Sequence, residues 1–307
     1  MSGSEKQNFL WVEQAAAIAR EAGSCLREFY AKGVETEYKG DVDLVTVADR
    51  TSEKLIRERL TAAFPDHGIF GEEGTRDRLA SGLRWYVDPL DGTTNFAHGF
   101  PHFCVSMGLE ERPEGLAATE DGTLVAAVLY DPLLDEMFLA ERGKGAWLNG
   151  RRMRVSKNAL LAESLVATGF PSRKRHASPN IHFYQEFTLR SHGVRRAGSA
   201  ALDLAYVAAG RMDAFWEFNL NPWDTAAGLL LVEEAGGLTT DFQGGHYRLD
   251  SREILASNGL IHKEMLGFFD DLFAGRDLTP IPSAQEYAEQ RQLQRGGEPS
   301  AVPAPAV

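Results

Sequence analysis

The chain has 307 residues, of which 43% are hydrophobic and 25% charged, and these proportions exclude a wholly disordered, collagen-like or coiled-coil protein. Its formal charge of −12 excludes general binding to a nucleic-acid backbone, which needs a basic surface. Two cysteines are too few for a disulfide framework or a four-cysteine zinc site, so we expect a reducing, cytoplasmic location.

Two helices followed by several strands are predicted for the first half of the chain. Apolar residues recur at helical spacing over 8–27, and a second helix is expected over 51–64, where Pro65 ends it. Short apolar runs then predict strands over 69–70, 83–87, 104–109, 124–130 and 136–140, with a long loop over 110–122. No apolar run approaches the ~20 residues of a membrane span, and no signal peptide is expected at the N-terminus.

The pattern changes after the turn dipeptide at residues 149–150. Short apolar runs over 165–168 and 214–216 alternate with helical patterns over 200–209 and 225–234, which indicates α/β layering. We therefore predict an α+β domain over 1–150 that carries most metal ligands and an α/β domain over 151–275. A polar tail over 276–307 is expected to be disordered, apart from a helical pattern over 285–295.

Two carboxylates follow the apolar run 83–87. Asp88 would lie at the end of that strand, where Pro89 blocks its continuation, and the pair Asp91-Gly92 indicates a turn. Both carboxylates and a backbone carbonyl would then converge on one tight turn, and Mg²⁺ takes oxygen ligands of this kind at about 2.0–2.1 Å. The alternative is that these residues only end the strand and shape the turn, although buried carboxylates need a partner.

The residues after that turn favour the binding of an anion such as phosphate. Thr93 or Thr94 could cap a following helix, and the backbone N–H groups of Gly92 and Thr93 near a helix start suit a phosphate. Metal-assisted hydrolysis is therefore favoured over covalent catalysis by serine or cysteine.

Further acidic residues also lie at element ends. They are Asp41, Asp43 and Asp49 in the segment 41–49, Glu72-Glu73 before a glycine, and Asp224 before a helical pattern. Each has a simpler explanation: Glu72-Glu73 as a solvated turn, Asp224 as a helix N-cap, and Asp49 as an exposed acid at a helix start, where it favours the helix dipole. The functional interpretation depends on their occurring together.

Histidine, cysteine and glycine motifs add little to this picture. Pro101 separates His98 from His102, so the two cannot share a helix face as zinc ligands do. Cys25 and Cys104 have no evident base beside them and are expected in the core. No glycine-rich nucleotide-binding motif is present.

These motifs together resemble the inositol monophosphatase family of Mg²⁺-dependent, lithium-sensitive phosphatases, and within it the bacterial SuhB-type branch. The matching segments are 43–49 (DLVTVAD), 71–73 (GEE), 85–96 (WYVDPLDGTTNF), 222–224 (PWD) and 233–237 (EEAGG). The resemblance implies an α/β fold, namely the layered αβαβα sandwich that inositol monophosphatases share with fructose-1,6-bisphosphatases. It also implies two to three Mg²⁺ ions per subunit.

The same resemblance implies the metal ligands. Glu72, Asp88 and the carbonyl oxygen of Leu90 would hold one ion, and Asp88, Asp91 and Asp224 the second. A third, weaker ion would lie near Glu72. Lys39 is a further candidate near the metals, although it lies one residue closer to the 43–49 motif than in some relatives.

The catalytic and substrate residues are likewise implied by the resemblance. Thr93, hydrogen-bonded to Asp49, would orient the attacking water, and the N–H groups of Gly92 and Thr93 would bind the phosphate. The substrate pocket would also contain Asp91, Ser199, Ala200, Glu217 and Asp224, with Glu217 contacting sugar hydroxyls.

The implied activity is hydrolysis of inositol-1-phosphate to inositol and phosphate by a cytoplasmic homodimer. The alternatives are a related phosphatase acting on a sugar, histidinol or 3′-nucleotide phosphate, or a protein-binding role in transcription antitermination and ribosomal RNA maturation. The acidic balance favours a protein partner from the transcription machinery over direct nucleic-acid binding. The loop over 110–122 and the tail over 276–307 depart from compact relatives.

Overall fold

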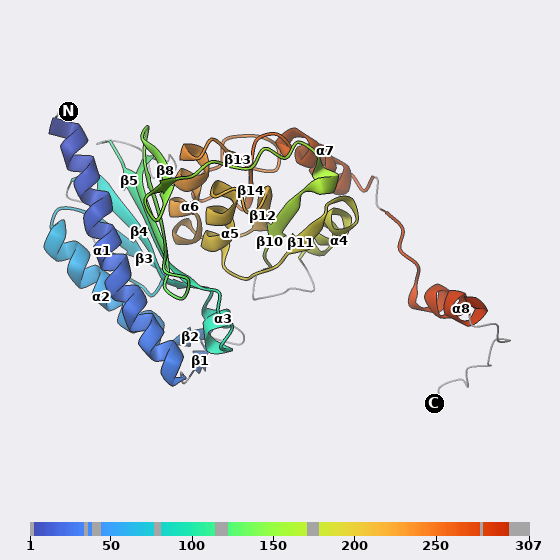
Figure 1. The fold of residues 1–307 in the computed structure, drawn as a ribbon, viewed down its shortest axis with the longest axis horizontal. Coiled ribbons are helices and arrows are strands. Elements are labelled where there is room, and N and C mark those ends of the chain that lie inside the picture. Colours follow the sequence, from blue (N-terminus) through green and yellow to red (C-terminus); the bar gives the residue numbers. More distant parts are fainter. Residues whose placement is uncertain are drawn as a thin grey trace.

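Two β-sheets alternate with three layers of helices in the computed structural model (Figure 1). The structure describes residues 3–33, 36–38, 44–76, 81–113, 122–170, 178–276 and 279–294. Three buried hydrophobic clusters separate the layers: one under the N-terminal helices, one between the sheets, and one behind the second sheet. The expected α/β class and the αβαβα layering are therefore confirmed.

The first layer consists of helices α1 (Gly3–Lys32) and α2 (Val47–Ala63), which pack side by side on the first sheet (Figure 1). Helix α1 is longer than the predicted 8–27, because no breaker interrupts it before Gly33, whose positive φ of 73° ends it. Its buried face includes Val12, Ala19 and Leu26. A two-stranded ribbon, β1 (Thr36–Tyr38) and β2 (Leu44–Thr46), connects the two helices.

The first sheet has seven strands in chain order, all antiparallel except for the parallel pair β3 and β4. The strands are β3 (Gly68–Gly71), β4 (Leu83–Asp91), β5 (Cys104–Glu111), β6 (Thr123–Asp131), β7 (Glu136–Glu141), β8 (Gly145–Leu148) and β9 (Arg151–Arg152). Because helices cover both faces, β5 and β6 are buried on both sides, which explains their nearly continuous apolar sequences.

Strand β4 corrects the expectation that Pro89 stops the strand. Asp88 pairs with Ser106 and Asp91 with Cys104, so three steps along β4 match two steps along β5. The extra residue makes a bulge, and a proline within a bulge does not break the ladder. The Pro89 carbonyl accepts a hydrogen bond of 2.9 Å from the Ser52 hydroxyl, which ties the bulge to α2.

The middle layer consists of α5 (Ala200–Ala208) and α6 (Pro222–Glu234), which pack against each other and contact both sheets. Helix α6 begins at Pro222, three residues before the predicted start, because Asn221 is its N-cap and proline suits the first helical position. The second sheet has the order β11-β10-β12-β14-β13 and mixes parallel with antiparallel pairs. Its strands are β10 (Leu165–Thr168), β11 (Gly193–Arg195), β12 (Ala214–Phe218), β13 (Leu238–Thr240) and β14 (Glu253–Ser257).

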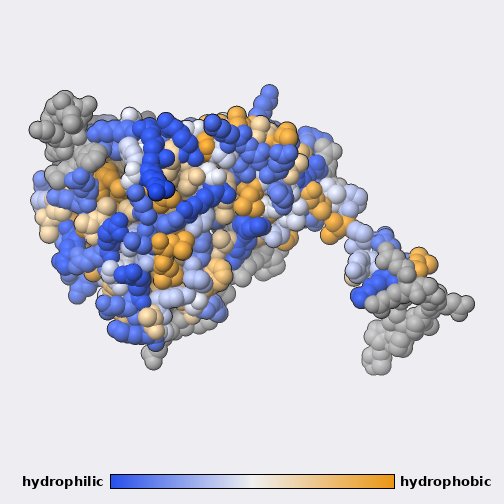
Figure 2. Space-filling model, in the orientation of Figure 1, coloured by the Kyte–Doolittle hydropathy of each residue, from blue (hydrophilic) through white to orange (hydrophobic). Residues whose placement is uncertain are grey.

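The last layer, α4 (Asn180–Arg190) and α7 (His262–Phe273), covers the outer face of the second sheet (Figure 1). Short helices α3 (Thr93–Ala97) and η1 (Leu161–Glu163) complete the body. Helix α8 (Ala284–Gln294) stands apart from the body in Figure 1, and its bounds agree closely with the helix predicted over 285–295. None of the described helices is long and apolar enough to cross a bilayer. Polar residues cover most of the face seen in Figure 2.

The division near residue 150 stays a prediction. Strands of the first sheet end at Arg152 and those of the second begin at Leu165. However, α5 and α6 come from the second half of the chain and pack on both sheets, so the two halves share one buried cluster. The predicted disordered end, residues 296–307, lies outside the described residues, as does most of the loop over 110–122.

Candidate active site

The bulge in β4 presents Asp88, which is only 2% exposed. Its Oδ1 accepts a hydrogen bond of 2.9 Å from the Leu90 amide, which fixes the turn. Burial raises the pKa of Asp88 well above its usual value, and the nearby carboxylates of Glu72, Asp91 and Asp224 raise it further. Four acidic side chains, two from β4, one from α6 and one from the turn after β3, therefore share one electrostatic environment.

Thr93 begins α3 directly beside the bulge. Its hydroxyl Oγ1 lies 3.0 Å from Oδ1 of Asp49 and 3.1 Å from the Leu90 carbonyl oxygen, and it can donate to either. The N-cap of α3 is Gly92 and not Thr93 or Thr94, which corrects the capping expectation. Gly92 has a φ of 99°, and a Cβ there would lie 2.9 Å from the His102 carbonyl, so glycine is required on both grounds.

Asp49 lies in the first turn of α2 and is only 1% exposed. The simpler explanation, an exposed acid at a helix start, is therefore wrong.

The carboxylate of Asp91 accepts hydrogen bonds from residues in the second half of the chain. Its Oδ2 accepts hydrogen bonds from the Ser199 hydroxyl at 2.6 Å and from the Ala201 amide at 2.7 Å. These contacts oppose the effect of burial, which raises the pKa of Asp91. Ser199 also caps α5 by accepting from the Leu202 amide at 3.4 Å. The serine predicted to contact substrate is thus already used to orient a carboxylate.

Asn95 of α3 fixes the loop that delivers Ser199. Its Nδ2 donates to the carbonyl oxygens of His102 at 2.8 Å and Ala197 at 2.9 Å. Gly198, with a φ of 88°, passes so close that a Cβ would lie 3.3 Å from the Asn95 amide. This clamp brings the start of α5 to the end of β4.

Asp224 is the third residue of α6 and is not the N-cap that the simpler explanation assigned to it. Its Oδ2 accepts from the Asn221 backbone amide at 2.7 Å in a capping box. Burial and the charge of Asp91 raise the pKa of Asp224 to about 7, against the lowering effect of Asn221.

Glu72 follows β3 on a turn that α2 organises. Its amide donates to the Val87 carbonyl at 3.1 Å, which places it beside β4. The buried carboxylate of Glu53 accepts from the amides of Glu73 at 2.7 Å and Thr75 at 3.1 Å. Sequence reasoning missed Glu53, although its spacing of four residues from Asp49 puts both on one helix face.

Glu217 lies within β12 and is 8% exposed. Burial raises the pKa of Glu217 well above its usual value, and Asp203, Asp224 and Asp91 add to this effect while Arg196 opposes it. Gly169 makes room for the carboxylate, because a Cβ at that position would overlap both carboxylate oxygens.

A cavity of about 150 Å³ lies between Asp91, Asp224 and Glu217. Predicted residues that line it are Asp91, Ser199, Ala200, Glu217 and Asp224. The cavity is also lined by residues that were not predicted as site residues: Asp203, Arg196, Gly169 and Phe170, with Asn95 at its edge. Asp203 follows Ser199 by one helical turn, a spacing that would have indicated a shared direction.

The donor set fits a hard divalent cation. It consists of carboxylate and carbonyl oxygens, which Mg²⁺ prefers, and the charges of Glu72, Asp91 and Asp224 raise the pKa of Asp88. No group of three or more histidine, cysteine, aspartate or glutamate side chains in the described ranges could hold a metal ion as it stands. Several of the oxygens are instead engaged by Ser199, Asn221 and the Leu90 amide.

Some predicted residues cannot be placed or lie elsewhere. Lys39, Asp41 and Asp43 lie outside the described residues. Cys104 is fully buried, with Sγ 4.0 Å from Oδ2 of Asp91, and burial raises the pKa of its thiol. Cys25, which was also expected in the core, is only half-buried in α1.

Residues 9–270 match the model of a protein family described as the inositol monophosphatase family. An inositol-1-monophosphatase from Rhizobium meliloti is 44% identical over 256 residues, which cover 81% of this chain and 91% of that protein. A protein named Nus factor SuhB from Pseudomonas aeruginosa is 46% identical over 239 residues, covering 76% of this chain and 85% of that protein.

The fold also matches solved structures. The extragenic suppressor protein suhB from Bartonella henselae superimposes with a TM-score of 0.78 at 42% sequence identity, covering 84% of this chain and 97% of that chain.

Proposed function

Because the chain belongs to the inositol monophosphatase family, we propose that it is a Mg²⁺-dependent phosphomonoesterase that hydrolyses inositol-1-phosphate. The observation that carries the proposal is the convergence of Glu72, Asp88, Asp91 and Asp224 beside the Thr93–Asp49 hydrogen bond. In a protein that only binds partners, nothing would offset the cost of four neighbouring acidic groups in a part-buried site.

Glu72, Asp88 and the Leu90 carbonyl would hold one Mg²⁺, and Asp88, Asp91 and Asp224 a second. A third ion would lie near Glu72, which gives two to three ions per subunit. When bound, the ions supply positive charge that neutralises the phosphate dianion and lowers the pKa of water. Lithium sensitivity is expected on the same grounds of family membership.

Thr93 and Asp49 would act as a proton relay. A threonine hydroxyl alone is a poor base, but the Thr93 hydroxyl lies 3.0 Å from Oδ1 of Asp49. Thr93 can therefore accept a proton from the attacking water while it passes its own proton to Asp49. The buried position of Asp49, at 1% exposure, keeps this carboxylate oriented toward Thr93.

The substrate would lie across the cavity from the relay. The N–H groups of Gly92 and Thr93 are free of partners within the helix at its start and would contact the phosphate. Glu217, at the cavity wall, would accept hydrogen bonds from hydroxyls of the alcohol, with Ser199 and Ala200 beside it. Related sugar, histidinol or 3′-nucleotide phosphates are the alternative substrates.

Phosphate release from a panel of esters tests the proposal. The panel contains inositol-1-phosphate, histidinol phosphate, fructose-1,6-bisphosphate and 3′-phosphoadenosine 5′-phosphate, each with Mg²⁺, with EDTA and with added Li⁺. We expect Mg²⁺-dependent, Li⁺-inhibited hydrolysis that is fastest for inositol-1-phosphate. Release from none of the four would refute the enzymatic proposal.

A second candidate function is a protein-binding role in transcription, because a relative of similar identity is named Nus factor SuhB. The acidic chain would bind protein rather than nucleic acid directly, and α8, which stands apart from the body, offers a segment for docking. A homodimer is proposed on family grounds. Pull-down with the full chain and with a chain ending at residue 276 tests docking, since a partner lost on truncation would support it.

A further inference from the structure

The cavity contains an acidic residue that the proposed mechanism does not use. Asp203 lies in the first turn of α5, is 1% exposed and lines the cavity together with Glu217. Within the described residues its Oδ1 has no hydrogen-bond partner. A buried carboxyl oxygen without a partner is costly, and such groups usually have a ligand or water as partner.

A structural role does not account for Asp203. Acids in the first turn favour the helix dipole, but the N-terminal amides of α5 are already bound: Ala201 donates to Asp91 and Leu202 to Ser199. The neighbouring Leu202 and Leu204 are fully buried, so an apolar side chain at position 203 would stabilise the helix packing more.

Two carboxyl groups therefore face one small cavity. Both line the cavity, the charge of Asp203 acts on Glu217, and Arg196, which lines the same cavity, is the cation that acts on both. A carboxylate can accept several hydrogen bonds, and neighbouring hydroxyls of a polyol offer donors at matching spacing. A volume of about 150 Å³ suits one ring-sized alcohol.

We propose that Asp203, together with Glu217, binds the hydroxyl groups of the leaving alcohol and so selects hydroxyl-rich phosphate esters. This inference rests on the proposed phosphatase function and narrows its substrate class. Asp203 would be a specificity-determining residue, since the proposed arrangement puts the reacting phosphate at the Asp91 side of the cavity.

Two substrates of the same ring size test the proposal. Inositol-1-phosphate carries hydroxyls, whereas cyclohexyl phosphate has a six-membered ring without them. For Asp203→Ala we expect kcat/KM on inositol-1-phosphate to fall about tenfold or more, while that on cyclohexyl phosphate stays within about twofold. Asp203→Asn retains one acceptor oxygen and should lie between the wild type and Asp203→Ala.

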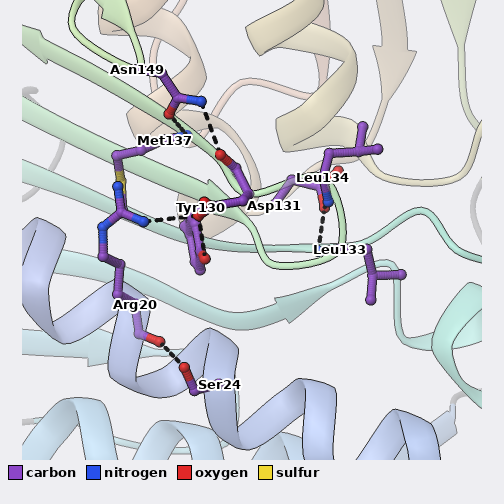
Figure 3. A network of polar contacts seen from close by, with 9 residues as sticks. Arg20, Ser24, Tyr130, Asp131, Leu133, Leu134, Met137 and Asn149 are labelled. Carbon is purple, nitrogen blue, oxygen red and sulfur yellow. Dashed lines mark hydrogen bonds and ion pairs between the residues drawn. The ribbon is translucent and has the colours of Figure 1, made fainter.

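Asp131 offers a matched control. It is also 1% exposed and has an unpartnered oxygen, Oδ2, but it ends β6, where its Oδ1 accepts from the amides of Leu133 and Leu134 (Figure 3). Asp131→Asn is expected to change stability and leave the ratio of the two kcat/KM values unaltered.

The outcomes separate this inference from the proposed function. If wild-type protein with Mg²⁺ hydrolyses neither ester, the proposed function fails and the inference with it. If the wild type prefers inositol-1-phosphate and Asp203→Ala leaves the ratio of the two kcat/KM values unchanged, the inference alone is overturned. Should Asp203→Ala not fold, the ratio measured for Asp203→Asn decides.

Discussion

Replacing Thr93 by alanine tests the proposed proton relay directly. The hydroxyl lies 3.0 Å from Asp49 Oδ1 and 3.1 Å from the Leu90 carbonyl oxygen, and the substitution removes both contacts. Loss of a positioned general base lowers kcat by about 10²–10⁴, which corresponds to roughly 3–5 kcal/mol of transition-state stabilisation. The lost hydrogen bond costs only about 1–3 kcal/mol of folding free energy, so the variant should still fold.

The assay compares kcat at saturating Mg²⁺ with Mg²⁺ affinity measured by calorimetry. Thr93→Ala should lower kcat and leave Mg²⁺ affinity near the wild-type value, while Thr93→Ser keeps the hydroxyl and most of the rate. Combining Thr93→Ala with Asp49→Asn should add little further loss, because the two residues act as one unit.

A kcat for Thr93→Ala within about threefold of wild type would refute the relay, since that range is far below the loss of a general base. Additive losses in the double variant would also count against it, because independent residues give additive effects.

Three further predictions concern the acidic cluster, the cavity wall and the core. Asp88→Asn should abolish both Mg²⁺ binding and turnover, because in the proposed arrangement Asp88 would be shared by the two ions; calorimetry that still shows two bound ions would contradict this. Gly169→Ala should raise KM at least about tenfold with Mg²⁺ affinity unchanged, because the added methyl displaces the Glu217 carboxylate; an unaltered KM for inositol-1-phosphate would argue against that contact. His262 is 3% exposed and lies between the hydroxyls of Thr240 and Ser257, and burial lowers its pKa to about 4. The folded state therefore binds fewer protons than the unfolded state between about pH 6.5 and 4. As a result, the free energy of unfolding falls as the pH is lowered through this range. Urea unfolding should show a loss of about 2 kcal/mol between pH 7 and pH 5, which His262→Gln removes; an equal loss in that variant would exclude His262 as the cause.

Local pattern was sufficient for much of the fold. The strands that became β4 to β7 were predicted from short apolar runs, because burial on both faces leaves no room for polar residues. Shorter strands at the edges, such as β9 and β13, carry too few apolar residues to give a pattern. Helices α4 and α7 were not predicted, although Met265, Phe269 and Leu272 recur along α7 at helical spacing.

The acidic cluster was visible in the sequence because its members lie beside apolar runs or helical patterns. Asp88 and Asp91 follow an apolar run, and Asp224 precedes a helical one, so their positions were set by local signals. The continuation of β4 through Pro89 was not predictable, since a bulge depends on how the partner strand is registered.

The amino-acid sequence by itself thus determined the elements, the family resemblance and the candidate acidic ligands, all of which depend on residues close together in the chain. Only the tertiary structure decided how those residues are oriented. The Ser199 hydroxyl donates to Asp91 across 108 residues of sequence, and Gly169, directly after β10, leaves room for the Glu217 carboxylate of β12. Contacts of this kind depend on how distant segments pack together, which hydrophobic periodicity and turn residues in the sequence do not predict.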